Sequence, residues 1–232
     1  MSLKPIGILG GMGPAATILL QKKLMEALPQ AVDDTDHIPL LIDMNPQVPS
    51  RIAHLIKETG EDPTPVLTKM AKRLEESGAV ALAMPCNTAH HYASAIKNAV
   101  SIPFLDMISL TARKVSQSTK DYQTIGILAS PAVRKTRLFE NALGRLNRTT
   151  IWPKDDGAIL SAIQLIKKQG VGEQSYSIIE SASRDLAQRG ASTQIVACSE
   201  FSLITEQLSS SGASLVDSLD LLVNAIIGFS TP

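Results

Sequence analysis

The chain has 232 residues, a length that fits one domain or two small ones. Lysine plus arginine and aspartate plus glutamate each number 22, so the formal net charge is zero. No basic excess is available to neutralise a nucleic-acid backbone or to bind an anionic membrane surface, and both partners are disfavoured. Hydrophobic residues make up 44% of the chain and exclude global disorder, whereas 3% aromatic residues predict an aliphatic core.

Two uncharged segments imitate export or membrane signals. Residues 5–21 follow Lys4, but four glycines and Pro14 interrupt any apolar helix there. Residues 77–96 are long enough to span a bilayer, yet they contain Pro85 and several polar residues, among them His91. The chain has only two cysteines, too few for the disulfide framework of a small secreted domain. We therefore expect a soluble cytoplasmic protein.

Short apolar runs alternate with amphipathic stretches along the first half of the chain. Such runs, bounded by turn residues, are typical of buried strands, and amphipathic periodicity is typical of helices. Pro14 suits the first turn of a helix. The predicted order is strand 6–9, helix from 14 to about 28, strand 38–42, helix 65–77 and strand 80–84.

The second half continues the alternation after a crossing near residues 102–104. The predicted order is strand 125–128, helices 133–143, 157–168 and 174–189, strand 194–197, and an apolar terminal helix 215–229. This last helix could return to cover the first half. Strand–helix alternation favours parallel sheets with right-handed crossovers, so we predict an α/β fold.

An internal repeat relates the two halves. Ile-Gly-Ile-Leu occurs at residues 6–9 and again at 125–128. Leu74 precedes a Gly-Ala pair and Cys86, as Leu186 precedes a second Gly-Ala pair and Cys198. The leucine-to-cysteine separation is 12 in both copies (86 − 74 and 198 − 186). Each copy is therefore expected to be a helix, a turn, an apolar strand and a cysteine.

The repeat predicts two pseudo-symmetric parallel-sheet halves. The first would comprise residues 1–103 plus 214–232 and carry Cys86, and the second would comprise residues 104–213 and carry Cys198. Ligands of open α/β sheets bind at the carboxyl ends of the strands, where both cysteines are expected. The active site is thus expected in the cleft between the halves.

The paired cysteines suggest acid–base chemistry, although free cysteine is also often an inert buried residue. A thiol at a helix N-terminus has a lowered pKa, and Asn87, Thr88 and Ser199 are good helix caps and good donors to a carboxylate. Equivalent groups on opposite sides of one carbon suit the removal of a proton from one face and its return to the other. This arrangement favours racemisation by two bases.

Three segments together resemble the aspartate/glutamate racemase family. They are Gly10-Gly11-Met12-Gly13-Pro14, Cys86-Asn87-Thr88-Ala89-His90 and Cys198-Ser199-Glu200, and the resemblance spans nearly the whole chain. It implies an amino-acid racemase without a cofactor, usually a homodimer, in which Cys86 and Cys198 donate and accept the proton. It also implies substrate contacts from Asn87, Thr88 and Ala89 at the α-carboxylate, and from Met12 and Ser199.

The resemblance extends to two basic residues. Arg51 matches the arginine that binds the side-chain carboxylate of an acidic substrate, and a guanidinium suits such a pair. Lys168 matches a lysine near the same carboxylate, with neighbouring Lys167 as the alternative register. The alternative for Arg51 is a solvated surface arginine, and for Lys168 a lysine at a helix C-terminus favoured by the helix dipole. The second cysteine block also departs from the family, which commonly has Gly-Cys-Thr-Glu, and this leaves substrate preference open.

Other interpretations remain. Gly11, Gly13 and Ala16 follow a strand as in a dinucleotide-binding dehydrogenase, but Asp43 comes too late to be the expected acidic residue. The cysteines lack the Cys-x-x-Cys spacing of redox proteins, and Cys86 with the histidines at 90 and 91 lacks the pattern of a zinc site. A ligand-binding protein, a maleate isomerase or a hydantoin racemase on the same scaffold stays possible. Two cysteines argue against the related decarboxylases, which keep one.

Overall fold

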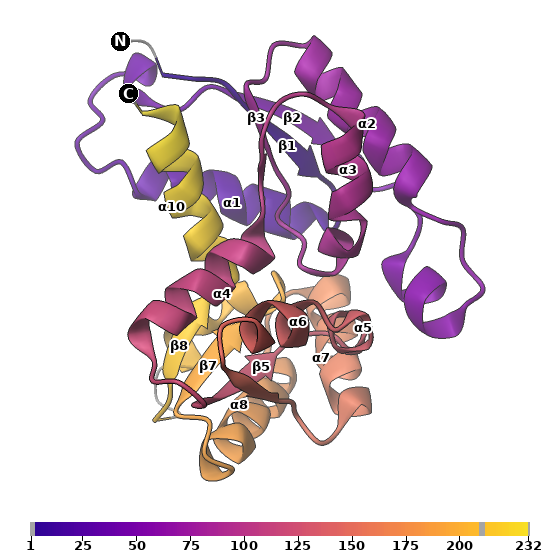
Figure 1. Ribbon diagram of the computed structural model, residues 1–232, viewed down its shortest axis with the longest axis vertical. Helices are drawn as coiled ribbons and strands as arrows, with labels where there is room; N and C mark the ends of the chain where they lie inside the picture. Colours follow the sequence, from indigo (N-terminus) through magenta and orange to yellow (C-terminus); the bar gives the residue numbers. More distant parts are fainter. Residues whose placement is uncertain (1–2, 209–211, 232) are drawn as a thin grey trace. The chain divides into compact units, whose positions relative to one another are not determined.

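The computed structural model describes residues 3–208 and 212–231 (Figure 1). The chain forms two compact units, one running to Met107 and resuming at Leu219, the other spanning Ile108–Ser218. Each unit contains a four-stranded parallel sheet flanked by helices. The α/β fold with two parallel-sheet halves is thus confirmed. Among the described residues, none of the helices has both the length and the apolar character that crossing a bilayer requires.

The first unit has the sheet order β2-β1-β3-β4. Helices α2 and α3 pack on one face, in a core built on Leu67, Met70, Leu74 and Ile96, and α1 lies on the other face (Figure 1). Its elements in chain order are β1 (Ile6–Gly10), α1 (Pro14–Glu26), β2 (Leu40–Met44), α2 (Thr64–Glu76), β3 (Ala81–Ala83), α3 (Ala93–Ala99) and β4 (Phe104–Leu105).

The second unit repeats this order as β6-β5-β7-β8. One apolar core joins α7 and α8 to the sheet, and another joins α4, α5 and α6 to its opposite face. Its elements are α4 (Met107–Ser118), β5 (Thr124–Leu128), α5 (Pro131–Thr136), α6 (Leu138–Gly144), β6 (Thr149–Ile151), α7 (Asp156–Gln169), α8 (Glu173–Gln188), β7 (Thr193–Val196), α9 (Thr205–Leu208) and β8 (Ser214–Asp217).

The repeat seen in the sequence is also a repeat of local structure. Gly78 and Gly190 follow α2 and α8 with φ of +97° and +92°, the left-handed conformation that ends many helices. The next residue in each copy donates its N–H to the helix carbonyl five residues back, Ala79 to Leu74 and Ala191 to Leu186, at 3.0 Å in both units. The shared pattern therefore fixes how each helix turns into the third strand.

The two strand glycines of the repeat are required by packing. A Cβ atom at Gly7 would lie 2.9 Å from Cβ of Ala79, and one at Gly126 would lie 3.1 Å from Cβ of Ala191. Both separations are shorter than ordinary van der Waals contact. In each unit, the central strand thus needs glycine so that the helix–strand turn can pack directly on its backbone.

Three sequence-based assignments are corrected. The expected helix 133–143 is two helices, because Arg137 adopts φ of +55° between α5 and α6. The expected helix 215–229 is strand β8 followed by α10 (Ser218–Ser230). The short strands β4 and β6 were not predicted. Because β4 pairs with β3, and β8 with β7, each crossing between units lies a few residues beyond the expected boundaries at 103 and 213.

Helix α10 belongs to the first unit, as the apolar terminal segment suggested. Lys23 on α1 pairs with Asp220 on α10, with 2.6 Å between Nζ and Oδ1. The N–H of Lys4 donates to the carbonyl of Ser230 at 3.0 Å, which joins the two ends of the chain. The last helix thus shares a face of the first sheet with α1 (Figure 1).

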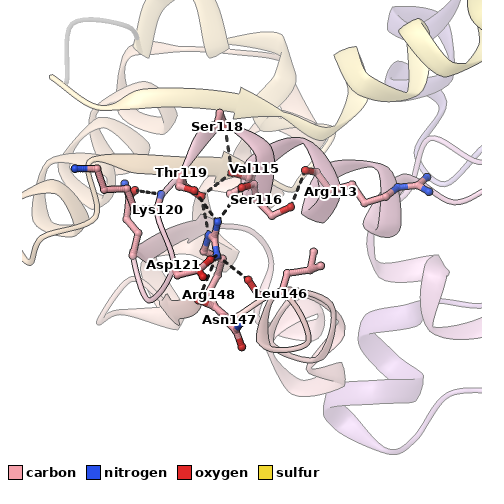
Figure 2. Close-up of polar contacts among 11 residues, drawn as sticks. Arg113, Val115, Ser116, Ser118, Thr119, Lys120, Asp121, Leu146, Asn147 and Arg148 are labelled. Carbon is pink, nitrogen blue, oxygen red and sulfur yellow. Dashed lines mark hydrogen bonds and ion pairs between the residues drawn. The ribbon is translucent and has the colours of Figure 1, made fainter.

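A buried arginine supports the second unit (Figure 2). Arg148 is 7% exposed, and its guanidinium donates to the carbonyl oxygens of Ser116, Thr119 and Leu146 at 2.6–2.8 Å. It also pairs with Asp121, whose own side chain is 65% exposed. Arg148 therefore connects the end of α4 with the turn before β6, mainly through hydrogen bonds to the backbone.

Candidate active site

Cys86 follows β3, at the carboxyl edge of the first sheet. The thiol residue is buried, and a 3₁₀ helix (Thr88–Tyr92) begins two residues later. His90 holds this turn in place, since its Nδ1 lies 2.9 Å from the Cys86 carbonyl oxygen and its Nε2 accepts the Met107 N–H at 3.1 Å. An Nε2 that accepts must be unprotonated, so Nδ1 carries the proton and donates to Cys86. Burial lowers the pKa of His90 and keeps the ring neutral.

The residues predicted to accompany Cys86 are brought together in part. Met12 and Ala89 belong to the same apolar cluster as Cys86. Ala89 is fully buried. Asn87 is buried and Thr88 is half-buried. The side chain of Asn87 does not cap the 3₁₀ helix, contrary to expectation.

The glycine-rich turn after β1 packs against its own unit. Gly11 has φ of +88°, and a Cβ atom there would lie 2.4 Å from the backbone carbon of Asn45, just beyond β2. The Gly11 N–H donates to Thr17 Oγ1 at 3.0 Å. The close approach that requires glycine at this position is therefore to the loop after β2, which explains the glycine without a dinucleotide.

Arg51 lies in the connection between β2 and α2. Its Nη1 donates to the carbonyl oxygens of Val48 and Pro49 at 3.2 and 3.0 Å, so its own loop orients the guanidinium. Three residues later, Nδ1 of His54 lies 2.8 Å from the hydroxyl oxygen of Tyr92, in the helix that follows Cys86. Val48 packs in the same cluster as Cys86. The arginine and the first cysteine thus belong to connected segments of one unit.

Cys198 occupies the equivalent position in the second unit, after β7. Its carbonyl oxygen accepts the N–H groups of Phe201 and Ser202 at 2.9 and 3.2 Å, which starts a short 3₁₀ helix (Phe201–Leu203). Its thiol donates to Glu200 Oε2 at 3.1 Å. Burial, together with the negative charge of Glu200, raises the pKa of Cys198 well above its usual range. The lowered pKa expected from a helix terminus is therefore wrong for Cys198.

Of the two candidate lysines, Lys167 reaches the Cys198 segment. Its Nζ lies 3.3 Å from Glu200 Oε1, the oxygen that does not accept the thiol. Lys168 is exposed, and its side chain leaves α7 in another direction because successive helical residues are rotated by about 100°. Ser199 is buried, with its hydroxyl 3.5 Å from Glu200 Oε2. The structure thus favours Lys167 over Lys168 as the lysine of this site.

Both cysteine turns are tied to the strand beside them. His90, four residues after Cys86, binds the backbone beyond β4. Ser202, four residues after Cys198, donates to Asp217 at the end of β8, with 2.8 Å between Oγ and Oδ1. The two units thus use different side chains at one equivalent position for the same purpose.

Metal binding finds no support at these turns. Since both ring nitrogens of His90 face backbone groups, His90 is not available to a metal. The described residues contain no cluster of three His, Cys, Asp or Glu side chains suited to a metal ion.

Three residues at these sites had no role predicted from the sequence. Glu200 was quoted within its motif, although it contacts the thiol directly. Tyr92 and His54 were not singled out at all. Tyr92 lies six residues after Cys86 and His54 three after Arg51, so their positions beside recognised residues were the available signal.

Solved structures of amino-acid racemases have a similar fold. The Picrophilus torridus aspartate racemase has a TM-score of 0.86 and 27% identity, over 97% of this chain and 93% of that one. A glutamate racemase from Francisella tularensis, solved in complex with D-glutamate, has a TM-score of 0.66 and 20% identity, over 98% of this chain and 81% of that one. The fold is thus the racemase fold.

The sequence pattern of the Asp/Glu/Hydantoin racemase family matches residues 9–226, so the chain belongs to this family. A curated relative, the broad-specificity amino-acid racemase RacX of Bacillus subtilis (strain 168), is 25% identical over 227 residues, which cover 96% of each chain. Membership of this family supports the prediction that the protein is an isomerase. The resemblance inferred from the cysteine segments is confirmed.

Proposed function

We propose that the protein interconverts the L and D forms of aspartate or glutamate without a cofactor, using Cys86 and Cys198 as a thiol and thiolate pair. The observation that carries the proposal is the equivalent placement of the two cysteines. Each is buried, and each follows the third strand of a sheet with the same strand order. In such sheets, the carboxyl edge is where ligands bind.

In this proposal, the two sulfur atoms act on opposite faces of the substrate's α-carbon. The thiolate of one cysteine removes the α-proton, and the thiol of the other donates its proton to the opposite face. One carbon–hydrogen bond breaks and another forms, so the substrate is inverted while the thiolate passes from one cysteine to the other. Each positioned acid or base contributes about 10²–10⁴ in rate.

Cys198 is suited to begin as the proton donor. Its raised pKa keeps the thiol protonated at neutral pH. For the reverse direction, the carboxylate of Glu200 is positioned to accept the thiol proton, because it already receives the hydrogen bond. Lys167 balances the charge of Glu200 from the other side. Glu200 is therefore proposed to help Cys198 alternate between acid and base.

Substrate binding is assigned by residue type. Donors from Asn87, Thr88, Ser199 and the backbone at Ala89 would hold the α-carboxylate, which is where negative charge develops after proton removal. Arg51 would bind the side-chain carboxylate, together with Lys167, and Met12 would line the pocket. The alternative is a broader substrate range, since RacX is a broad-specificity racemase. The family resemblance also supports a homodimer.

Exchange of the α-proton tests the proposal. Each pure enantiomer of aspartate and glutamate is incubated with the dialysed protein in D₂O, and optical rotation and α-deuterium are followed by polarimetry and NMR. We expect loss of rotation together with deuterium incorporation. If neither amino acid exchanges, the proposal fails. Activity on a hydantoin or maleate alone would assign the protein to another reaction on the same scaffold, and tight NAD binding would favour a dehydrogenase.

A further inference from the structure

The segment that carries Arg51 projects from the body of the first unit. It begins a helical turn at Arg51, continues as a π-helix (Ala53–Lys57) and ends at Glu58, which has φ of +56° (Figure 1). Its backbone hydrogen bonds are local, from His54 to Ser50 and from Thr59 to Ala53. Local hydrogen bonds form a turn but do not fix its position relative to the sheet. That position must depend on side-chain contacts with the rest of the unit.

Tyr92 supplies such a contact from the Cys86 side. It is 5% exposed and packs in the cluster that contains Cys86 and Val48. Its hydroxyl oxygen lies 2.8 Å from Nδ1 of His54. Burial raises the pKa of Tyr92 to about 12, so the phenol is protonated at neutral pH. The phenol therefore joins the segment of the cysteine to the segment of the arginine.

The surroundings of Tyr92 match this linking position. The ring of His91 contacts the Tyr92 ring edge-on at 5.0 Å between centroids, and the His54 ring lies 6.0 Å away. Both rings flank the phenol, and its hydroxyl is engaged by His54. Tyr92 thus lies between the segment that carries Arg51 and the segment that follows Cys86.

We propose that the His54–Tyr92 hydrogen bond is a positioning device that holds Arg51 at a fixed separation from Cys86 and so favours substrates with a side-chain carboxylate. The inference rests on the proposed function, because it assigns Cys86 to the α-carbon and Arg51 to the side chain. The spacing between those two groups sets which side chain the arginine can reach. Neither His54 nor Tyr92 takes part in proton transfer.

Three variants separate positioning from general stability. Tyr92→Phe and His54→Leu remove the hydrogen bond, whereas His54→Asn keeps a hydrogen-bonding atom near the position of Nδ1. The readouts are KM and kcat for aspartate and the inhibition constant of alanine, which is aspartate without the side-chain carboxylate. A hydrogen bond contributes about 0.5–1.5 kcal/mol, which corresponds to at most roughly a tenfold change in affinity. We expect Tyr92→Phe and His54→Leu to raise KM for aspartate by up to about that factor with little change in kcat.

In these two variants, the inhibition constant of alanine is expected to change much less. The variant His54→Asn is expected to restore most of the affinity for aspartate. Equal losses for aspartate and alanine, a fall in kcat alone, or an unchanged KM would overturn the inference. Hydrogen exchange of amides 51–60 in the free protein gives a readout without substrate, and faster exchange is expected in both disrupting variants. Unchanged exchange also overturns the inference. A wild-type protein inactive on acidic amino acids overturns the proposed function as well, whereas an active wild type with unaffected variants overturns only the positioning role.

Discussion

The thiol of Cys198 donates a hydrogen bond to Glu200 Oε2, with 3.1 Å between sulfur and oxygen. Both residues lie in the turn between β7 and the short helix that follows it. A thiolate beside a carboxylate is disfavoured by charge repulsion, and burial disfavours it further. These two effects outweigh the attraction of a short helix terminus for negative charge. The sulfur of Cys198 is therefore protonated at neutral pH.

Replacing Glu200 should lower the pKa of Cys198. In Glu200→Gln the charge repulsion is removed, so we expect alkylation of Cys198 by iodoacetamide to begin at lower pH. Mass spectrometry of the peptides resolves Cys198 from Cys86. Glu173→Gln, which removes an exposed carboxylate at the start of α8, is the control for net charge, and an unchanged profile in Glu200→Gln would contradict the assignment.

Each cysteine should be required for racemisation. Cys86→Ser and Cys198→Ser keep the size of the side chain but replace the thiol with a much weaker acid, so racemisation should fall by at least about 10². Both cysteines are 7% exposed, and serine fits the same space, so thermal unfolding should change little. Polarimetry measures the activity and circular dichroism the fold. Substantial activity in either variant would show that two-base catalysis is wrong.

Arg148 should stabilise the second unit much more than its ion pair suggests. Arg148→Leu leaves three partly buried carbonyl oxygens without this donor, and we expect the free energy of unfolding to fall by roughly 1–3 kcal/mol. Asp121→Asn removes only the exposed partner and should cost less than about 1 kcal/mol. Urea denaturation followed by circular dichroism measures both. Equal losses would mean that the ion pair, rather than the backbone contacts, carries the effect.

His90 should make the first unit sensitive to acid. Its folded pKa is below the ordinary 6.5, so below that pH the unfolded state binds a proton that the folded state does not. Stability is therefore fully present above about pH 6.5 and declines as the pH falls. His90→Gln, which retains an acceptor for the Met107 N–H, should be less stable at neutral pH but lose less on acidification.

Urea midpoints between pH 7.5 and 5 measure this difference. His91→Gln is the matched control, because the neighbouring ring is exposed and its titration should affect folding less, although burial also lowers its pKa. If the pH dependence of His90→Gln equals that of the wild type, His90 is not the group responsible.

The sequence by itself determined the two-unit α/β plan and the location of the cysteines. Both follow from local rules, since a Gly-Ala turn, a strand glycine and a following cysteine mark the same short structure in both units. Leu74 and Leu186, with their Gly-Ala pairs, end their helices in the same way, as the spacing predicted. The strands that precede Cys86 and Cys198 are buried inside their sheets, so a short apolar run was sufficient to predict each of them.

Tertiary structure alone decided which side chains meet at these sites. Lys167 and Lys168 are equivalent in sequence, and only the orientation of α7 brings Lys167 to Glu200. His54 and Tyr92 are 38 residues apart, and no local pattern predicts their hydrogen bond. The raised pKa of Cys198 depends on burial, which is a property of the packed chain. Segments such as β8 were misassigned because an apolar run alone does not distinguish strand from helix, and pairing with β7 selects the strand.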